Sequence, residues 1–137
     1  MIEAPAELGH QPGVVGVGID VVDIERMRRA LGRTEGFGPR YFTESELARA
    51  RPEDPAPSLA ARFAAKEAVL KALGLGIFDL PLREIEVTGG GGSPPAIRLH
   101  ATAATAAADR GVRRWLVSLT HDGGVAAAVV VAVASSG

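Results

Sequence analysis

The sequence has no cysteine among its 137 residues. This absence excludes a disulfide framework and a thiolate metal site, so any bound metal must have oxygen or imidazole ligands. It also favours a reducing compartment over an oxidising one.

Long hydrophobic runs are also missing, since no stretch approaches the roughly 18 apolar residues of a membrane-spanning helix. The start, MIEAPAELGHQPG, lacks the basic and apolar regions of a secretory signal. The most apolar run, VAAAVVVAVA, has the length of a buried strand. We therefore expect a cytoplasmic protein with no membrane partner and no nucleic-acid partner. The net charge of −1 says nothing by itself, so the distribution of the charges matters more.

The length and composition are those of one ordinary folded domain, with 47% apolar and 23% charged residues. We expect a flexible N-terminal extension over residues 1–13 and a single domain over residues 14–137. Apolar periodicity predicts helices and hairpins without strict βαβ alternation, which indicates an α+β domain with a mainly antiparallel sheet packed against a long central helix. Strands are expected over residues 14–19, 85–88, 96–99, 115–120 and 125–133, and helices over 21–31, 43–49, 58–74 and 101–110.

Local signals delimit several of these elements. Thr43 and Glu46 have the spacing of a capping box, which predicts the start of a short helix. Three prolines within residues 51–57 predict a loop. Ser58 is the expected N-cap of the long helix, and Gly74 its expected end.

Arginines are concentrated between positions 26 and 51, where seven of them face only three acidic residues. Such a run is either a solvated helix face or a docking surface for an acidic partner. The seven are Arg26, Arg28, Arg29, Arg33, Arg40, Arg49 and Arg51.

The long helix carries a lysine where an apolar residue is expected. Leu59, Phe63, Leu70 and Leu73 define its predicted core stripe, and Lys66 falls inside that stripe. A buried ammonium group must either extend to the solvent or meet a counter-charge.

Glu67 and Lys71 lie beside the stripe, four residues apart on the same helix. By spacing alone they form an exposed i,i+4 ion pair. Alternatively, a carboxylate flanked by Lys66 and Lys71 suits a diphosphate with a hard cation between the phosphates and the acid.

Asp20 follows a strand with the pattern Gly-Val-Gly. The third glycine of a dinucleotide-binding fingerprint is missing, which excludes a Rossmann site. Asp20 is either the cap of the following helix or, with Glu67, a ligand of Mg²⁺, which needs only one or two carboxylates when phosphates and water complete its shell.

Four motifs in this order give the sequence its resemblance to a known family. GVGIDVVDIERM, FTESELARA, ARFAAKEAVLKALG and VSLTHD are similar to the motifs of the holo-acyl-carrier-protein synthases, which are small phosphopantetheinyl transferases. The resemblance spans about residues 14–133. It implies an α+β fold, a homotrimer with active sites between protomers, and Mg²⁺ bound by Asp20 and Glu67.

The resemblance also implies roles for neighbouring residues. Catalysis would depend on Glu67, Lys71 and Asp20, and a surface for an apo acyl carrier protein would be formed by Arg26, Arg29 and Arg33. The residues implied for coenzyme A are Arg62, Lys66, Lys71, Gly74, Gly76 and His121. The segment 75–78, Leu-Gly-Ile-Phe, departs from the polar pair usual in the family, which puts nucleotide binding and protomer packing in question.

The implied reaction is attack by a carrier-protein serine on coenzyme A, with release of adenosine 3′,5′-bisphosphate. The base is Glu67 or a metal-bound water, and the carrier is of the fatty-acid or the polyketide type. Two alternatives stay open: a non-catalytic trimeric α+β binding domain, and a nucleotide hydrolase with the same metal pair.

Overall fold

The computed structural model describes residues 13–134, and the predicted extension over residues 1–13 lies almost entirely outside them. Three antiparallel strands form the main sheet in the order β1-β5-β4. They are β1 (Val14–Asp23), β5 (Val125–Val133) and β4 (Arg114–Asp122). A separate hairpin pairs β2 (Ile85–Gly90) with β3 (Ser93–Leu99). The predicted α+β class and antiparallel pairing are confirmed.

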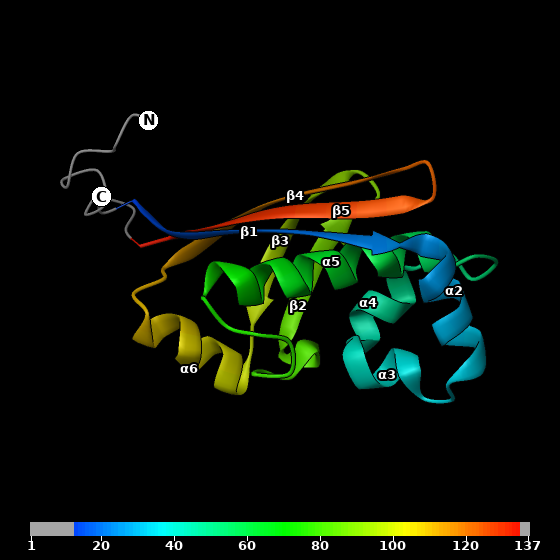
Figure 1. Cartoon of the computed structure of the whole chain (residues 1–137), viewed down its shortest axis with the longest axis horizontal. Helices are drawn as coiled ribbons and strands as arrows, with labels where there is room; N and C mark the ends of the chain where they lie inside the picture. The colour runs from blue at the N-terminus through cyan, green and yellow to red at the C-terminus, as the bar shows by residue number, and fades with distance from the viewer. Residues whose placement is uncertain (1–12, 135–137) are drawn as a thin grey trace.

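The long helix α5 (Ala56–Ala72) lies along one face of the main sheet, between that sheet and the β2–β3 hairpin (Figure 1). Three short helices gather near the start of α5: α2 (Ile24–Arg33), α3 (Phe37–Tyr41) and α4 (Glu44–Arg49). A 3₁₀ turn, η1 (Leu82–Glu84), precedes β2, and α6 (Ala101–Asp109) lies near the other end of α5. No helix within residues 13–134 is long and apolar enough to cross a bilayer.

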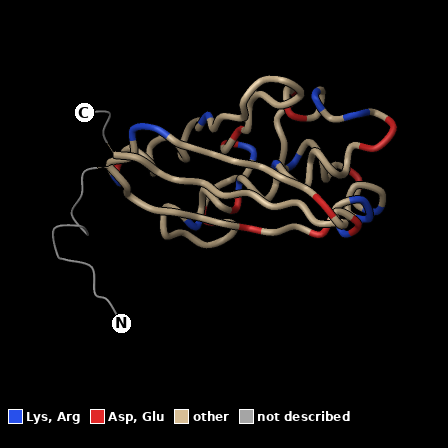
Figure 2. Tube along the Cα trace, turned by 90° about the horizontal axis from the view of Figure 1, so that it is seen from above, with Lys and Arg blue, Asp and Glu red and all other residues tan. Residues whose placement is uncertain are grey.

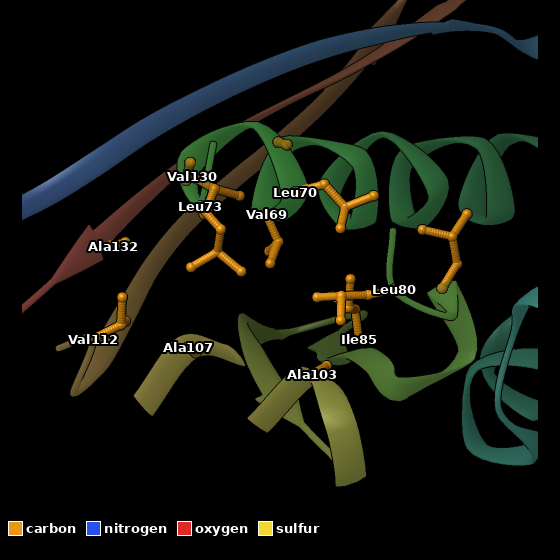
Figure 3. Packing of buried hydrophobic residues seen from close by; sticks show 13 residues of the cluster. Val69, Leu70, Leu73, Leu80, Ile85, Ala103, Ala107, Val112, Val130 and Ala132 are labelled. Atoms are coloured by element: carbon orange, nitrogen blue, oxygen red, sulfur yellow. The ribbon is translucent and has the colours of Figure 1, made fainter. Parts of the chain in front are cut away.

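Helix α5 is buried on more sides than the predicted single stripe. Small residues such as Ala64 and Ala68 are fully buried, and so are Val69 and Leu70. The cause is its position between two layers, because a helix covered on both sides needs no polar face. Figure 3 shows Val69, Leu70 and Leu73 pointing away from the sheet toward α6 and the start of β2.

The start of α5 also differs from the prediction. The helix begins at Ala56, two residues before the expected cap Ser58, with proline in its first turn. Proline is tolerated there because the amide that it lacks would have no partner within the helix. The predicted end is confirmed, since Leu73 is the C-cap and Gly74 follows with a φ of +74°.

The first strand is longer than predicted, and this changes the interpretation of Asp20. Strand β1 continues through Asp20 to Asp23, and the Asp23 carboxylate caps α2 by accepting from the Arg26 amide at 3.1 Å. The hypothesis that Asp20 is a helix cap is therefore wrong. The capping box of Thr43 and Glu46 is confirmed, whereas α3 was not predicted.

Candidate active site

The two glycines before Asp20 allow β1 and α5 to approach closely. A Cβ on Gly18 would lie 1.8 Å from the Ala68 carbonyl oxygen, and one on Gly16 would lie 1.9 Å from that of Ala72. Only glycine fits at such distances, so the Gly-Val-Gly pattern serves backbone packing. Alternate strand residues share a face, so Asp20 also faces α5.

Asp20 meets Lys71 of α5 at this contact. The Lys71 ammonium donates to Asp20 Oδ1 at 3.0 Å and to the Ile19 carbonyl at 3.0 Å. The Asp20 side chain is 14% exposed and that of Lys71 is 52% exposed. Among residues 13–134, no ion pair joins Lys71 to Glu67, so the predicted i,i+4 pair is replaced by one with Asp20.

Glu67 lies beside Asp20, and this proximity changes its titration. Partial burial, the charge of Asp20 and a hydrogen bond between the two carboxyls raise the pKa of Glu67 from 4.5 to about 7. The charge of Lys71 opposes the rise. Two neighbouring carboxyls of this kind form an acceptor site for a cation or a proton.

The donor set at this point fits Mg²⁺ but does not enclose it. Asp20 and Glu67 supply hard oxygen ligands, as Mg²⁺ requires. No group of three or more histidine, cysteine or acidic residues that could hold a metal occurs within the described chain. The remaining ligands would therefore have to come from water and from a bound phosphate.

The two carboxylates border a cavity of about 330 Å³. Its other lining comes mainly from α2 and from aromatic rings, with Arg26 as the cationic member. The apolar lining residues include Met27, Phe37 and Phe63. The cavity thus joins an acidic end to an apolar wall, and it lies beside the helix that carries the arginine cluster.

A second cavity, of about 540 Å³, is basic. It is lined by Arg49, Arg51, Arg62 and His121, together with the tip of the β2–β3 hairpin, and it shares no lining residue with the first cavity. Such a concentration of cations suits an anionic ligand. The structure therefore separates the predicted contacts Arg62 and His121 from the acidic pair within one chain.

Comparison with known proteins identifies the family. The profile of the 4′-phosphopantetheinyl transferase superfamily matches residues 16–130. The chain belongs to this superfamily. Membership makes the protein an enzyme, which decides against the non-catalytic binding domain.

The transferase has curated relatives of similar length. It is 53% identical to a holo-[acyl-carrier-protein] synthase of Frankia casuarinae, over 87% of this chain and 97% of the relative. It is 49% identical to that of Streptomyces avermitilis, over 87% and 97%. Among solved structures, the Helicobacter pylori synthase in complex with coenzyme A is 32% identical with a TM-score of 0.74, covering 85% of this chain and 98% of the other. The Mycobacterium tuberculosis enzyme is 38% identical with a TM-score of 0.68, covering 87% and 96%.

In this transferase Lys66 is far less accessible than its expected role requires. Its side chain has no exposed area, and its ammonium group donates to Glu46 Oε1 at 2.8 Å and to the carbonyls of Leu82 and Ile85 at 3.0 and 2.6 Å. Of the two alternatives for a lysine in the stripe, the structure has the counter-charge, which Glu46 supplies. Contact with coenzyme A phosphates is not compatible with this arrangement, because all three ammonium donors are occupied inside the fold.

The glycines after α5 border an exposed apolar loop. Gly74 lines a shallow groove beside Lys71, and the Gly76 amide donates to the Asp79 carboxylate at 2.6 Å. That bond occupies the amide that was expected to face a nucleotide. The Phe78 side chain is 73% exposed, so this apolar loop presents a large hydrophobic side chain at the surface.

The arginine cluster of the transferase divides into paired and unpaired members. Arg28 pairs with Glu25 and with Asp54, at 3.0 Å for the latter. Within residues 13–134 no salt bridge holds the three predicted docking residues, Arg26, Arg29 and Arg33. Sequence reasoning missed Arg49 and Arg51 as lining residues, although both belong to the arginine cluster.

Proposed function

We propose that the chain transfers the 4′-phosphopantetheine arm of coenzyme A to a serine of an apo acyl carrier protein. The observation that carries this proposal is the meeting of Asp20, Glu67 and Lys71 at one point of a transferase of this superfamily. The activity of the curated relatives and the coenzyme A complex of a similar enzyme support the choice of substrates.

The reaction forms a bond between the serine oxygen and the coenzyme A phosphorus that bears pantetheine. The bond from that phosphorus to the bridging oxygen breaks, and its electron pair leaves with adenosine 3′,5′-bisphosphate. Asp20 and Glu67 would hold Mg²⁺, which would supply positive charge for the diphosphate. Lys71 can add a hydrogen bond to the leaving phosphate, since its ammonium group is half exposed and already oriented by Asp20.

The serine proton needs an acceptor close to the phosphorus. Glu67 suits this task, because its carboxyl lines the cavity beside Asp20 and carboxylates commonly act as general bases. Bound Mg²⁺ would favour the ionised form of Glu67, and a water molecule at the site is the second candidate acceptor.

We further propose that the active site is completed between copies of the chain in a homotrimer. Two observations support this. The acidic cavity and the basic cavity share no lining residue, which is compatible with a nucleotide that takes its two sets of contacts from adjoining copies. In addition, the outer face of the main sheet is apolar and exposed, with Ile19 62% exposed, and Figure 2 shows few charges along its strands.

We also propose that the carrier protein docks on helix α2. Arg26, Arg29 and Arg33 have no acidic partner in the described chain, and Arg26 also lines the cavity that contains the two carboxylates. An acidic carrier helix bound there would bring its serine to the reactive end of the cavity. The cytoplasm is the expected compartment, since a chain without cysteine has no need of an oxidising one.

The test is incubation with coenzyme A, Mg²⁺ and a panel of apo carrier proteins, followed by mass spectrometry of the carriers. The expected result is one added phosphopantetheine arm with the parent and none with Glu67→Gln. The matched control is Glu35→Gln, an exposed carboxylate after α2, which should load at the parental rate. Release of adenosine bisphosphate without any carrier would instead support the nucleotide hydrolase.

A further inference from the structure

Strand β2 has one edge that no other strand covers. It pairs with β3 alone in the described chain, and its opposite edge faces α4 and α5. The backbone groups of Ile85, Val87 and Gly89 point to that edge, and buried backbone groups need partners. Charged side chains of α4 and α5 satisfy them in place of a strand.

Three side chains make these edge bonds. Lys66 donates to the Ile85 carbonyl at 2.6 Å, and Glu46 accepts from the Val87 amide at 2.7 Å. Arg62 donates to the carbonyls of Val87 and Gly89 at 2.5 and 2.9 Å. The residues contacted are Ile85, Val87 and Gly89, so the side chains follow the strand from its base to the hairpin tip.

The first two of these side chains also neutralise each other in the interior. Lys66 and Glu46 have no exposed side-chain area and lie 2.8 Å apart. Glu46 further accepts from the Thr43 amide at 2.9 Å, and no buried polar side-chain atom in the described chain lacks a partner. Removing two charges from water is costly, and an apolar pair of similar size often gives equal or greater stability. A role other than stability is therefore the better reason for the pair.

The hairpin tip explains what that role would be. Gly89, Gly90 and Gly91 line the basic cavity beside Arg62, and all have positive φ. A run of glycines has little intrinsic order, since glycine loses more conformational freedom on folding than any other residue. A cavity wall of this kind keeps its shape only if the strand that carries it is held at its base.

We propose that Lys66 and Glu46 are positioning residues, which hold β2 against α4 and α5 so that the glycine tip forms the wall of the anion cavity. The proposal rests on the proposed function in one respect, because it takes coenzyme A as the ligand of that cavity. In this proposal Lys66 holds the hairpin, and Arg62 and the other cations of the basic cavity contact the phosphates of coenzyme A.

The test separates positioning from stability by removing both charges together. Glu46→Leu with Lys66→Met keeps the buried volume similar and leaves no unpaired charge. This double variant should fold, but the Ile85 carbonyl and the Val87 amide lose their edge partners, while the Val87 carbonyl keeps Arg62. We expect KM for coenzyme A to rise about tenfold, which corresponds to the loss of one hydrogen bond to a charged group. We expect kcat to change by less than about threefold.

Hydrogen exchange gives a second readout that needs no enzyme activity. In the double variant, exchange should accelerate about tenfold or more over residues 85–92 and stay at the parental rate in β1 and β5. The matched control is Arg28→Met, which removes a cation from an exposed ion pair far from β2. It should leave both the exchange of the hairpin and KM for coenzyme A unchanged.

The outcomes are distinct. Parental KM and parental exchange in a folded double variant would overturn the positioning role, and so would a large loss of kcat with unchanged KM. If the double variant does not fold, Glu46→Gln with Lys66→Met also removes both charges and keeps one side-chain oxygen as an acceptor for the Thr43 amide, and the same rises in KM and in hairpin exchange are expected. If the parent itself shows no transfer activity, the proposed function fails, whereas the exchange experiment still tests whether the pair holds the hairpin.

Discussion

Replacing Glu67 by glutamine is expected to stabilise the folded protein at alkaline pH while abolishing transfer. In the parent, burial and Asp20 raise the pKa of Glu67 from 4.5 to about 7. The folded state therefore binds this proton more tightly than the unfolded state. The resulting stabilisation is fully present below pH 4.5 and is lost as the pH rises through about 7.

The magnitude follows from the same values. At 1.36 kcal/mol per pH unit, the rise in pKa corresponds to at most about 3 kcal/mol. Glu67 is only partly buried, so solvent screening reduces this to about 1–2 kcal/mol. Glutamine stays neutral beside Asp20 at every pH, so the variant does not lose stability through ionisation at this position.

The assay is urea unfolding of parent and Glu67→Gln at pH 5 and pH 8, at one protein concentration. We expect similar free energies of unfolding at pH 5 and an advantage of about 1–2 kcal/mol for the variant at pH 8, or roughly 5 °C in Tm. Adding Mg²⁺ at pH 8 should stabilise the parent and leave the variant unchanged, because the metal replaces the lost proton. A variant less stable than the parent at pH 8 would refute the reasoning.

Three further substitutions test the packing, the assembly and the docking surface. Gly18→Ala should lower the free energy of unfolding in urea by about 3 kcal/mol, because the new Cβ would lie 1.8 Å from a helix carbonyl oxygen. The control Gly32→Ala has open space around it in α2 and should raise the free energy of unfolding by about 0.5–1 kcal/mol. Ile19→Glu should convert the oligomer to monomers in sedimentation velocity and abolish carrier loading, and a variant still trimeric would exclude the sheet face as the interface. Arg29→Glu should raise KM for the carrier about tenfold at low salt, whereas Arg28→Ala, already paired with acids, should change it much less.

Much of the fold could be predicted from local patterns. The long helix, its end at Gly74, the hairpin over residues 85–99 and the two C-terminal strands all follow from apolar periodicity and turn residues. The capping box of Thr43 and Glu46 is predictable because its two bonds join neighbouring residues. The family is predictable for a similar reason, since each of the four motifs is a short run of specific residues and all four occur in the family's order.

Long-range partners could not be predicted in this way. Nothing local distinguishes Lys71 bound to Glu67 from Lys71 bound to Asp20, since the first pair depends on helix spacing and the second on how closely β1 approaches α5. Lys66 is a similar case. Its place in the apolar stripe required a counter-charge, but only the packing of α4 against β2 shows that Glu46 supplies it.

The sequence by itself therefore determined most of the helices and strands and the family, and it singled out Asp20 and Glu67 as candidate metal ligands. These inferences depend on residue identity and on short motifs. The tertiary structure alone decided that Asp20 is a strand residue facing α5, that Lys66 is buried, and that the acidic and basic cavities lie apart in one chain. The physical reason is the same in each case. The interaction between charged groups depends on the distance between them. That distance is set by the packing of segments that are far apart in the chain.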